Sequence, residues 1–215
     1  IQTLLKGFPV VAVTGPRQSG KSTLAARMLP DRPYVSLEDP DEEDFARNDP
    51  RRFLDQFPDG AVLDEIQRCP FLLSYLQGIV DRDGRTGLFL LTGSQQFGLM
   101  AEITQTLAGR VGLLELLGFS LSEIAETDFA PKTLEELLFT GLYPPIHDRQ
   151  VSPALWYPNY VRTYIERDIR QMVNVGDLSA FQAFLYLCAG RVGQLVNFTS
   201  TKPPSSIFMI RVWRP

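Results

Sequence analysis

The sequence GPRQSGKST decides the fold of this chain; it comprises Gly15, Pro16, Arg17, Gln18, Ser19, Gly20, Lys21, Ser22 and Thr23. The stretch fits the pattern G-x-x-x-x-G-K-[ST] at every position. It follows the apolar, strand-like run VVAVT (10–14) and opens a segment with helical apolar spacing (21–29). A loop between a strand and a helix can turn backbone N–H groups toward an anion, and the helix adds its positive N-terminus. All nine residues are therefore predicted to form a binding loop for nucleotide phosphates.

Four side-chain positions within this loop carry separate expectations. Side chains at Gly15 or Gly20 would obstruct the path of the phosphates, which explains glycine there. Lys21 is expected to reach the β- and γ-phosphates, and the Ser22 hydroxyl is expected to bind Mg²⁺. Thr23 is placed for a further phosphate contact.

A second motif, AVLDE, ends in two acids, Asp64 and Glu65. An acid at the end of a strand near the phosphate loop can hold Mg²⁺, usually through water, so Asp64 is the expected second metal-binding residue. An adjacent acid can deprotonate an attacking water, and this role is assigned to Glu65. The pair favours hydrolysis over transfer to another acceptor.

Two further catalytic candidates lie later in the chain. In LLTGSQ, a small hydroxyl residue at the end of a strand could sense the γ-phosphate or position the water; Ser94 is the first choice and Thr92 the second. In LAGRV, Arg110 is expected near the nucleotide, where it could neutralise transition-state charge in the same chain or in a neighbour. The alternative for Arg110 is an ordinary surface arginine that enters a strand.

Composition excludes several classes of function. The 215 residues carry a net charge of −4 and contain two cysteines and one histidine. These counts argue against a disulfide framework, a histidine metal site and a surface that coats nucleic acid. No apolar run approaches the roughly 18 residues needed to span a bilayer, and a cytoplasmic location is expected. His147, in PPIHDR, is predicted to be a solvated loop residue.

Strand-like and helix-like segments alternate up to about residue 127, which predicts an α/β domain: a parallel sheet with helices on both faces. From 128 onward only helical patterns occur, among them one with Asp177 as its cap, and the end is irregular from about residue 198. The expected domains are therefore 1–127 and 128–215. The second is expected to be a small, incomplete helical domain.

Several motifs together resemble one family. VVAVTGPRQSGKSTL, AVLDEIQRCPFLLSYLQGIVD, LFLLTGSQQF, LAGRV, GLYPP and YVRTYIERDIRQM look like the AAA-like prokaryotic P-loop ATPases with a helical C-terminal domain. The resemblance implies a three-layer, AAA-type core, ATP as the nucleotide, and Mg²⁺. In relatives the second domain continues into a winged-helix-like DNA-binding unit; here the residues after about 197 depart from that pattern, which suggests a truncated or frameshifted end.

The favoured function is a Mg²⁺-dependent ATPase that works as a switch or small motor and passes its state to a protein partner through the helical domain. The alternatives are a P-loop kinase and a non-hydrolysing nucleotide-binding module. DNA is expected to bind weakly and without sequence preference, if at all. Only four bases and no acids lie between 188 and 215, and no complete recognition element follows them.

Overall fold

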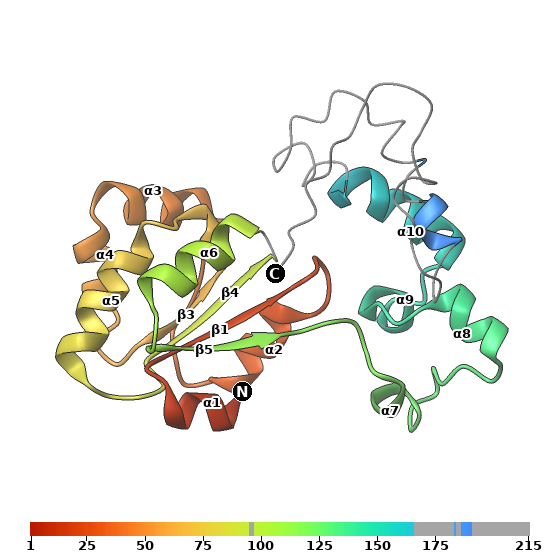
Figure 1. The fold of residues 1–215 in the computed structure, drawn as a ribbon, viewed down its shortest axis with the longest axis horizontal. Helices are drawn as coiled ribbons and strands as arrows, with labels where there is room; N and C mark the ends of the chain where they lie inside the picture. Colours follow the sequence, from red (N-terminus) through yellow and green to blue (C-terminus); the bar gives the residue numbers. More distant parts are fainter. Residues whose placement is uncertain (95–96, 166–182, 184–185, 191–215) are drawn as a thin grey trace. The chain divides into compact units, whose positions relative to one another are not determined.

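The computed structural model describes residues 1–94, 97–165, 183 and 186–190. Its centre is a five-stranded sheet with the strand order β2-β3-β4-β1-β5, in which every pairing is parallel (Figure 1). The strands are β1 (Val10–Gly15), β2 (Tyr34–Ser36), β3 (Ala61–Asp64), β4 (Phe89–Ser94) and β5 (Val111–Glu115). The predicted parallel α/β sheet is thus confirmed.

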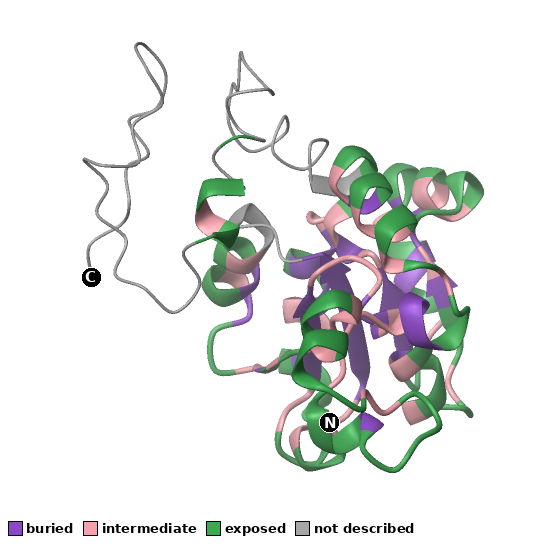
Figure 2. Ribbon diagram, turned by 90° about the vertical axis from the view of Figure 1, so that its right-hand side faces the viewer, coloured by how far each residue is buried: buried purple, intermediate pink, exposed green. Residues whose placement is uncertain are grey.

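Both faces of the sheet are covered, as the continuous apolar strands require. Val10 and Ala12 of β1 face one hydrophobic cluster, whereas Val11 and Val13 face the other. The first cluster contains side chains of α3 (Pro40–Asn48), α4 (Pro50–Asp55), α5 (Leu72–Asp83) and α6 (Phe97–Thr106). The second contains side chains of α1 (Gln2–Gly7) and α2 (Lys21–Met28). Figure 2 shows the resulting three layers, with the strands buried between the helices.

Local sequence explains several helix boundaries. Asp39 caps α3 by accepting a hydrogen bond from the Asp41 N–H, and Pro40 occupies the first helical position, where proline is favoured. Gly84 ends α5 in the left-handed conformation. A short 3₁₀ helix, η1 (Ile66–Arg68), follows β3 and leads to Cys69. Cys69 is fully buried in the first cluster, and this burial raises the pKa of its thiol.

The segment after the sheet is helical. It contains α7 (Leu121–Ile124), α8 (Leu134–Thr140), α9 (Pro144–Asp148), α10 (Pro153–Tyr160) and the π-helical turn η2 (Val161–Ile165). The described chain divides into two compact units, Ile1–Trp156 and Tyr157–Pro215. The boundary expected near residue 128 stays a prediction. The cap at Asp177 and the basic residues from Arg191 onward lie outside the described residues.

The prediction for His147 is wrong. The residue lies in α9 and is only 6% exposed. Its Nε2 atom is 2.9 Å from the Gly141 carbonyl oxygen, and its ring makes edge contacts with Phe119 and Phe129. Pro144 and Pro145 start this short helix, because proline is well tolerated in a first helical turn.

Candidate functional site

The site lies at the carboxyl edge of the sheet. Because all strands are parallel, β1, β3 and β4 end at this same edge with Gly15, Asp64 and Ser94. β4 lies between the other two strands, and its Ser94 is paired with Gly15 of β1. The fold therefore brings the phosphate loop and the acidic motif to either side of β4, at the edge where parallel sheets bind ligands.

The two glycines of the loop serve different physical needs. Gly15 has φ +147°, and a Cβ atom there would lie 2.0 Å from the carbonyl oxygen of Leu116. Gly20 has φ +94°, but a Cβ atom there would meet nothing within 4 Å. Glycine at Gly15 is thus required by close packing against the chain after β5; that it also leaves room for the phosphates stays a prediction.

Lys21 is held inside the loop, although it is charged. The residue is 5% exposed, and its Nζ donates a 2.8 Å hydrogen bond to the Pro16 carbonyl. Burial lowers the pKa of Lys21, while the nearby Glu65 and Asp64 carboxylates oppose that shift. Lys21 is also the first residue of α2, whose N-terminus has no side-chain cap. A phosphate oxygen could replace the Pro16 carbonyl as the partner of this ammonium group.

Thr92 positions the two acids. Its hydroxyl donates a short hydrogen bond to an Asp64 carboxylate oxygen and accepts one from the Glu65 N–H at 3.1 Å. Asp64 is buried at the end of β3, and Glu65 follows in the left-handed conformation with φ 59°. Both hydrogen-bonding roles of Thr92 are therefore used within the protein, so the hydroxyl is poorly placed to sense a phosphate.

Glu65 has the environment of a proton acceptor. Its partial burial raises the pKa of the carboxyl group, and a hydrogen bond from the Gln67 side chain opposes the rise. A carboxylate with a raised pKa is a better base than an ordinary one. No sequence pattern singled out Gln67, which lies in η1 and orients this carboxylate.

Two hydroxyls at the site have no partner within the protein. The Oγ atoms of Ser19, in the loop, and Ser94, at the end of β4, are buried and make no hydrogen bond. Buried polar groups are nearly always hydrogen-bonded, so each such group calls for an explanation. Phosphate oxygens or bound water would satisfy both. Between the two candidates from β4, this observation favours Ser94.

Tyr34 belongs to the site, although the sequence analysis did not single it out. Its phenol lies near enough to Asp64 and Ser22, the two residues predicted to hold Mg²⁺, for both to influence its pKa. Partial burial and the Asp64 carboxylate raise the pKa of the Tyr34 phenol. The signal available in the sequence was the position of YVSL as the strand before AVLDE; the pairing of β2 with β3 makes the two motifs neighbours.

The remaining loop residues lie around this centre. Pro16, Arg17 and Gln18 are partly exposed, and Gln18 has a positive φ of 61°. Thr23 is exposed in the first turn of α2. Gln18 and Gly20 give the loop its tight curvature, because both adopt backbone conformations with positive φ.

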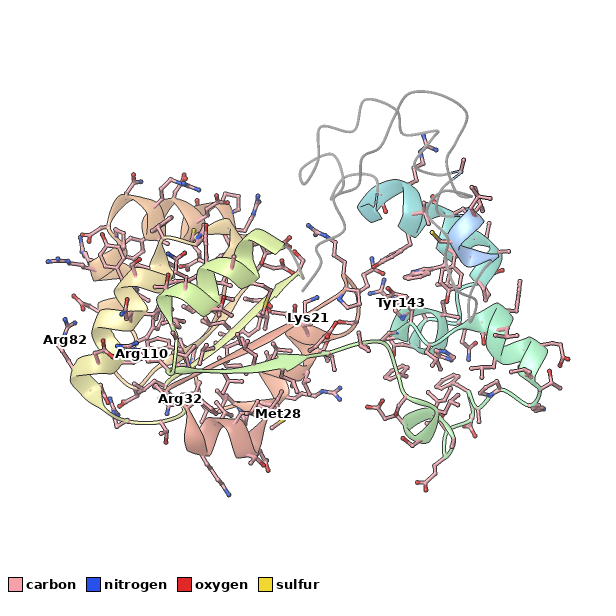
Figure 3. All side chains as sticks on the ribbon, viewed as in Figure 1. Lys21, Met28, Arg32, Arg82, Arg110 and Tyr143 are labelled. Atoms are coloured by element: carbon pink, nitrogen blue, oxygen red, sulfur yellow. The ribbon has the colours of Figure 1, made fainter. Side chains whose placement is uncertain are left out.

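The expected place of Arg110 near the nucleotide of its own chain is wrong, whereas a role at the site of a neighbouring copy stays a prediction. Arg110 precedes β5 and accepts a backbone hydrogen bond from Val10, at the amino edge of the sheet. Its guanidinium forms an ion pair with Asp81 of α5. Figure 3 shows Arg110 and Lys21 at opposite ends of the strands. The parallel topology explains the error, since a residue just before a strand cannot share an edge with the ends of its neighbours.

The fold and this loop define a P-loop NTPase. The profile described as "AAA domain" matches residues 7–125, more than half of the chain, and the chain belongs to this family. A second profile, "Domain of unknown function (DUF8612)", matches residues 131–205. The family resemblance expected from the motifs is confirmed.

The chain is also similar to curated proteins and to solved structures, at low sequence identity. The chain is 32% identical over 175 residues to "Uncharacterized protein Rv2008c" of Mycobacterium tuberculosis and, equally, to "Uncharacterized protein Mb2031c" of Mycobacterium bovis. These matches cover 80% of the chain but only 38% of each relative. Among solved structures, the Walker-type ATPase PABY2304 of Pyrococcus abyssi is similar to this chain, at 17% identity and a TM-score of 0.45. The match covers 89% of this chain and 73% of the chain of PABY2304.

Proposed function

We propose that the chain is a Mg²⁺-dependent ATPase whose nucleotide state is passed to a protein partner. Membership of the AAA domain family implies nucleotide binding. The observation that carries the further step is the set of polar and charged groups at one sheet edge, two of which have no partner within the protein. A buried lysine, two buried hydroxyls without partners, and two adjacent acids all lie where the phosphate loop ends. Phosphate, water and a cation would complete their interactions.

The donor set suits magnesium. Ser22 lies in the first turn of α2, directly after the phosphate loop, and Asp64 ends β3 at the same edge of the sheet. Mg²⁺ is usually held by one or two protein oxygens, with phosphates and waters as its other ligands. Among the described residues no three His, Cys, Asp or Glu side chains gather into a metal site, which agrees with a cation held mainly by the nucleotide. Ser22 and Asp64 would hold it, and the cation would neutralise charge on the phosphates.

Four residues of the site would each have a separate role in ATP hydrolysis. Lys21 exchanges the Pro16 carbonyl for oxygens of the β- and γ-phosphates. Ser94 donates a hydrogen bond to the γ-phosphate or to the attacking water. Glu65 accepts a proton from that water. The oxygen of the water then bonds to the terminal phosphorus, and the bond from that phosphorus to ADP breaks. Thr92 holds Glu65 and Asp64 in place for these steps.

The decisive experiment measures phosphate release from ATP by the purified chain, with Mg²⁺ and with no other phosphoryl acceptor present. Turnover that stops on chelation of Mg²⁺ supports a hydrolase. Tight ATP binding without turnover would favour the non-hydrolysing module, and turnover only after an acceptor is added would favour a kinase. The same assay with added duplex DNA tests whether DNA is a partner.

A further inference from the structure

The side-chain amide of Gln67 is paired at its nitrogen and unpaired at its oxygen. The Nε2 atom donates a hydrogen bond to a carboxylate oxygen of Glu65. The Oε1 atom is buried and has no hydrogen-bond partner among the residues that the structure describes. Buried polar atoms are nearly always paired. This oxygen therefore needs a partner from outside the protein, as do the hydroxyls of Ser19 and Ser94.

The chemistry of this oxygen limits what the partner can be. An amide oxygen only accepts hydrogen bonds, whereas the hydroxyls of Ser19 and Ser94 can also donate them. Phosphate oxygens are acceptors, so a triphosphate can pair with the two hydroxyls but not with Oε1 of Gln67. The partner of Oε1 is therefore a hydrogen-bond donor or a cation. Beside the proposed base, Glu65, the donor that the proposed reaction supplies is the attacking water.

The backbone holds Gln67 next to Glu65. Glu65 leaves β3 with φ 59° and ψ 47°, a left-handed conformation that is uncommon for any residue except glycine and that turns the chain sharply. The turn η1 follows, and the Cys69 N–H donates a 3.0 Å hydrogen bond to the Ile66 carbonyl. Both Ile66 and Cys69 are fully buried, so they fix the backbone on either side of Gln67. Backbone strain of this kind clusters at functional sites.

We propose that Gln67 is a second acceptor for the attacking water: Glu65 takes one proton of this water, and Oε1 of Gln67 accepts a hydrogen bond from the other. The inference rests on the function proposed above. The second proton stays on the oxygen that bonds to phosphorus, so Gln67 neither gains nor loses a proton. With both hydrogens directed at the protein, a lone pair of the water faces the γ-phosphate. Gln67 is then a catalytic residue that orients the base through Nε2 and the water through Oε1.

The test measures hydrolysis and binding of ATP by the whole chain and by Gln67→Met, which keeps the side-chain length and removes both polar groups. We expect kcat to fall by about 10- to 100-fold, because hydrogen bonds to the base and to the water are both lost. The dissociation constant for ATP with Mg²⁺ should stay within about twofold of the parent value, since neither contact is made to the nucleotide. Gln67→Leu should reproduce both results. Thermal unfolding checks that each variant is folded.

The matched control is Gln56→Met. The side chain of Gln56 also donates a hydrogen bond, at 3.1 Å to the Phe53 carbonyl, but it lies at the end of α4. This variant should hydrolyse ATP at the parent rate. A similar loss of rate in Gln56→Met and Gln67→Met would contradict a specific role for Gln67.

A second background separates the two contacts of Gln67. In Glu65→Gln the base is absent, so a residue that acted only through Glu65 would have no further effect. We expect the double variant, Glu65→Gln with Gln67→Met, to hydrolyse ATP about 3- to 10-fold more slowly than Glu65→Gln in single-turnover measurements. Equal rates would overturn the inference, because Gln67 would then act on Glu65 alone.

Two further outcomes are decisive. If Gln67→Met weakens ATP binding only when Mg²⁺ is present, Oε1 is a cation ligand and the inference is overturned. If the parent chain does not hydrolyse ATP at all, the proposed function fails. If the parent hydrolyses ATP and folded Gln67→Met is equally active, the inference fails alone, so the two failures are distinguishable.

Discussion

The two edges of the sheet differ in how their polar groups are satisfied. At the amino edge, Arg110 pairs with Asp81, and Arg85 forms hydrogen bonds with the carboxylates of Asp59 and Asp83. At the carboxyl edge, Ser19 and Ser94 are buried without partners, and a left-handed residue, Glu65, follows β3. The charged pairs of the first edge satisfy one another, although Arg32, just before β2, also has a buried Nη1 atom without a partner. At the second edge two partnerless hydroxyls and the acids that follow β3 gather in one place, which makes this edge the candidate binding site.

The largest expected difference between the edges concerns turnover. Glu65→Gln should lower phosphate release by about 10²- to 10⁴-fold, the usual contribution of a general base, because an amide cannot accept the proton of water. ATP affinity should be retained, since the amide has nearly the same shape. Asp81→Asn, an acid of the amino edge, should turn over ATP at the parent rate. Hydrolysis at the parent rate by Glu65→Gln would remove Glu65 as the base.

The second largest effect is on nucleotide binding. Lys21→Ala should weaken ATP affinity by about 10- to 100-fold, because a charge-assisted contact to the phosphates is lost. Calorimetric titration measures this change, and the exposed Lys6 on α1 supplies the control Lys6→Ala, for which no change is expected. Equal affinity in folded Lys21→Ala and in the parent would show that the loop does not bind phosphate as proposed.

Replacement of one glycine at each edge of the sheet separates an effect on protein stability from an effect on ATP binding. Both Gly15 and Gly60 have positive φ, and a Cβ atom would lie within 2.0 Å of the Leu116 or Leu88 carbonyl oxygen, respectively. Gly15→Ala and Gly60→Ala should each reduce the free energy of unfolding by about 1–3 kcal/mol, which denaturant titration can measure. Only Gly15→Ala should also weaken ATP binding. Similar losses of affinity in both variants would mean that binding follows overall stability.

The smallest expected effect is that of Arg110→Ala. Because Arg110 lies at the amino edge, its removal should leave turnover unchanged when the protein is dilute. The measurement is the rate of phosphate release over a series of protein concentrations. A loss of rate that appears only at high concentration would assign Arg110 to a site on a neighbouring copy, and a loss at all concentrations would contradict its placement.

Local sequence was sufficient to predict the strands and to place the loop 15–23 and the two acids at the ends of β1 and β3. Each depends on a short pattern: an apolar run for β1, the glycine and lysine spacing for the loop, and an acidic strand end for Asp64 and Glu65. The parallel sheet followed from the alternation of strands and helices. These features are encoded within a few neighbouring residues.

Relations between strands could not be predicted in the same way. That β4 lies between β1 and β3 is a property of the sheet order, and it decides that Thr92 joins the acids while Ser94 stays available. Tyr34 was missed for the same reason, because its role depends on pairing with β3. Arg110 was misplaced because nearness in sequence to a predicted strand does not say which edge a residue occupies.

The burial of Cys69 has a practical use in chemical labelling. A thiol must ionise to react with a maleimide. Cys69 is fully buried and the pKa of its thiol is raised, so it should not react. The other cysteine, Cys188, is partly exposed and lies in the second compact unit. A fluorophore should therefore attach at Cys188 alone in the unaltered protein. Its emission on addition of ATP would report whether the nucleotide state of the sheet domain reaches the helical unit.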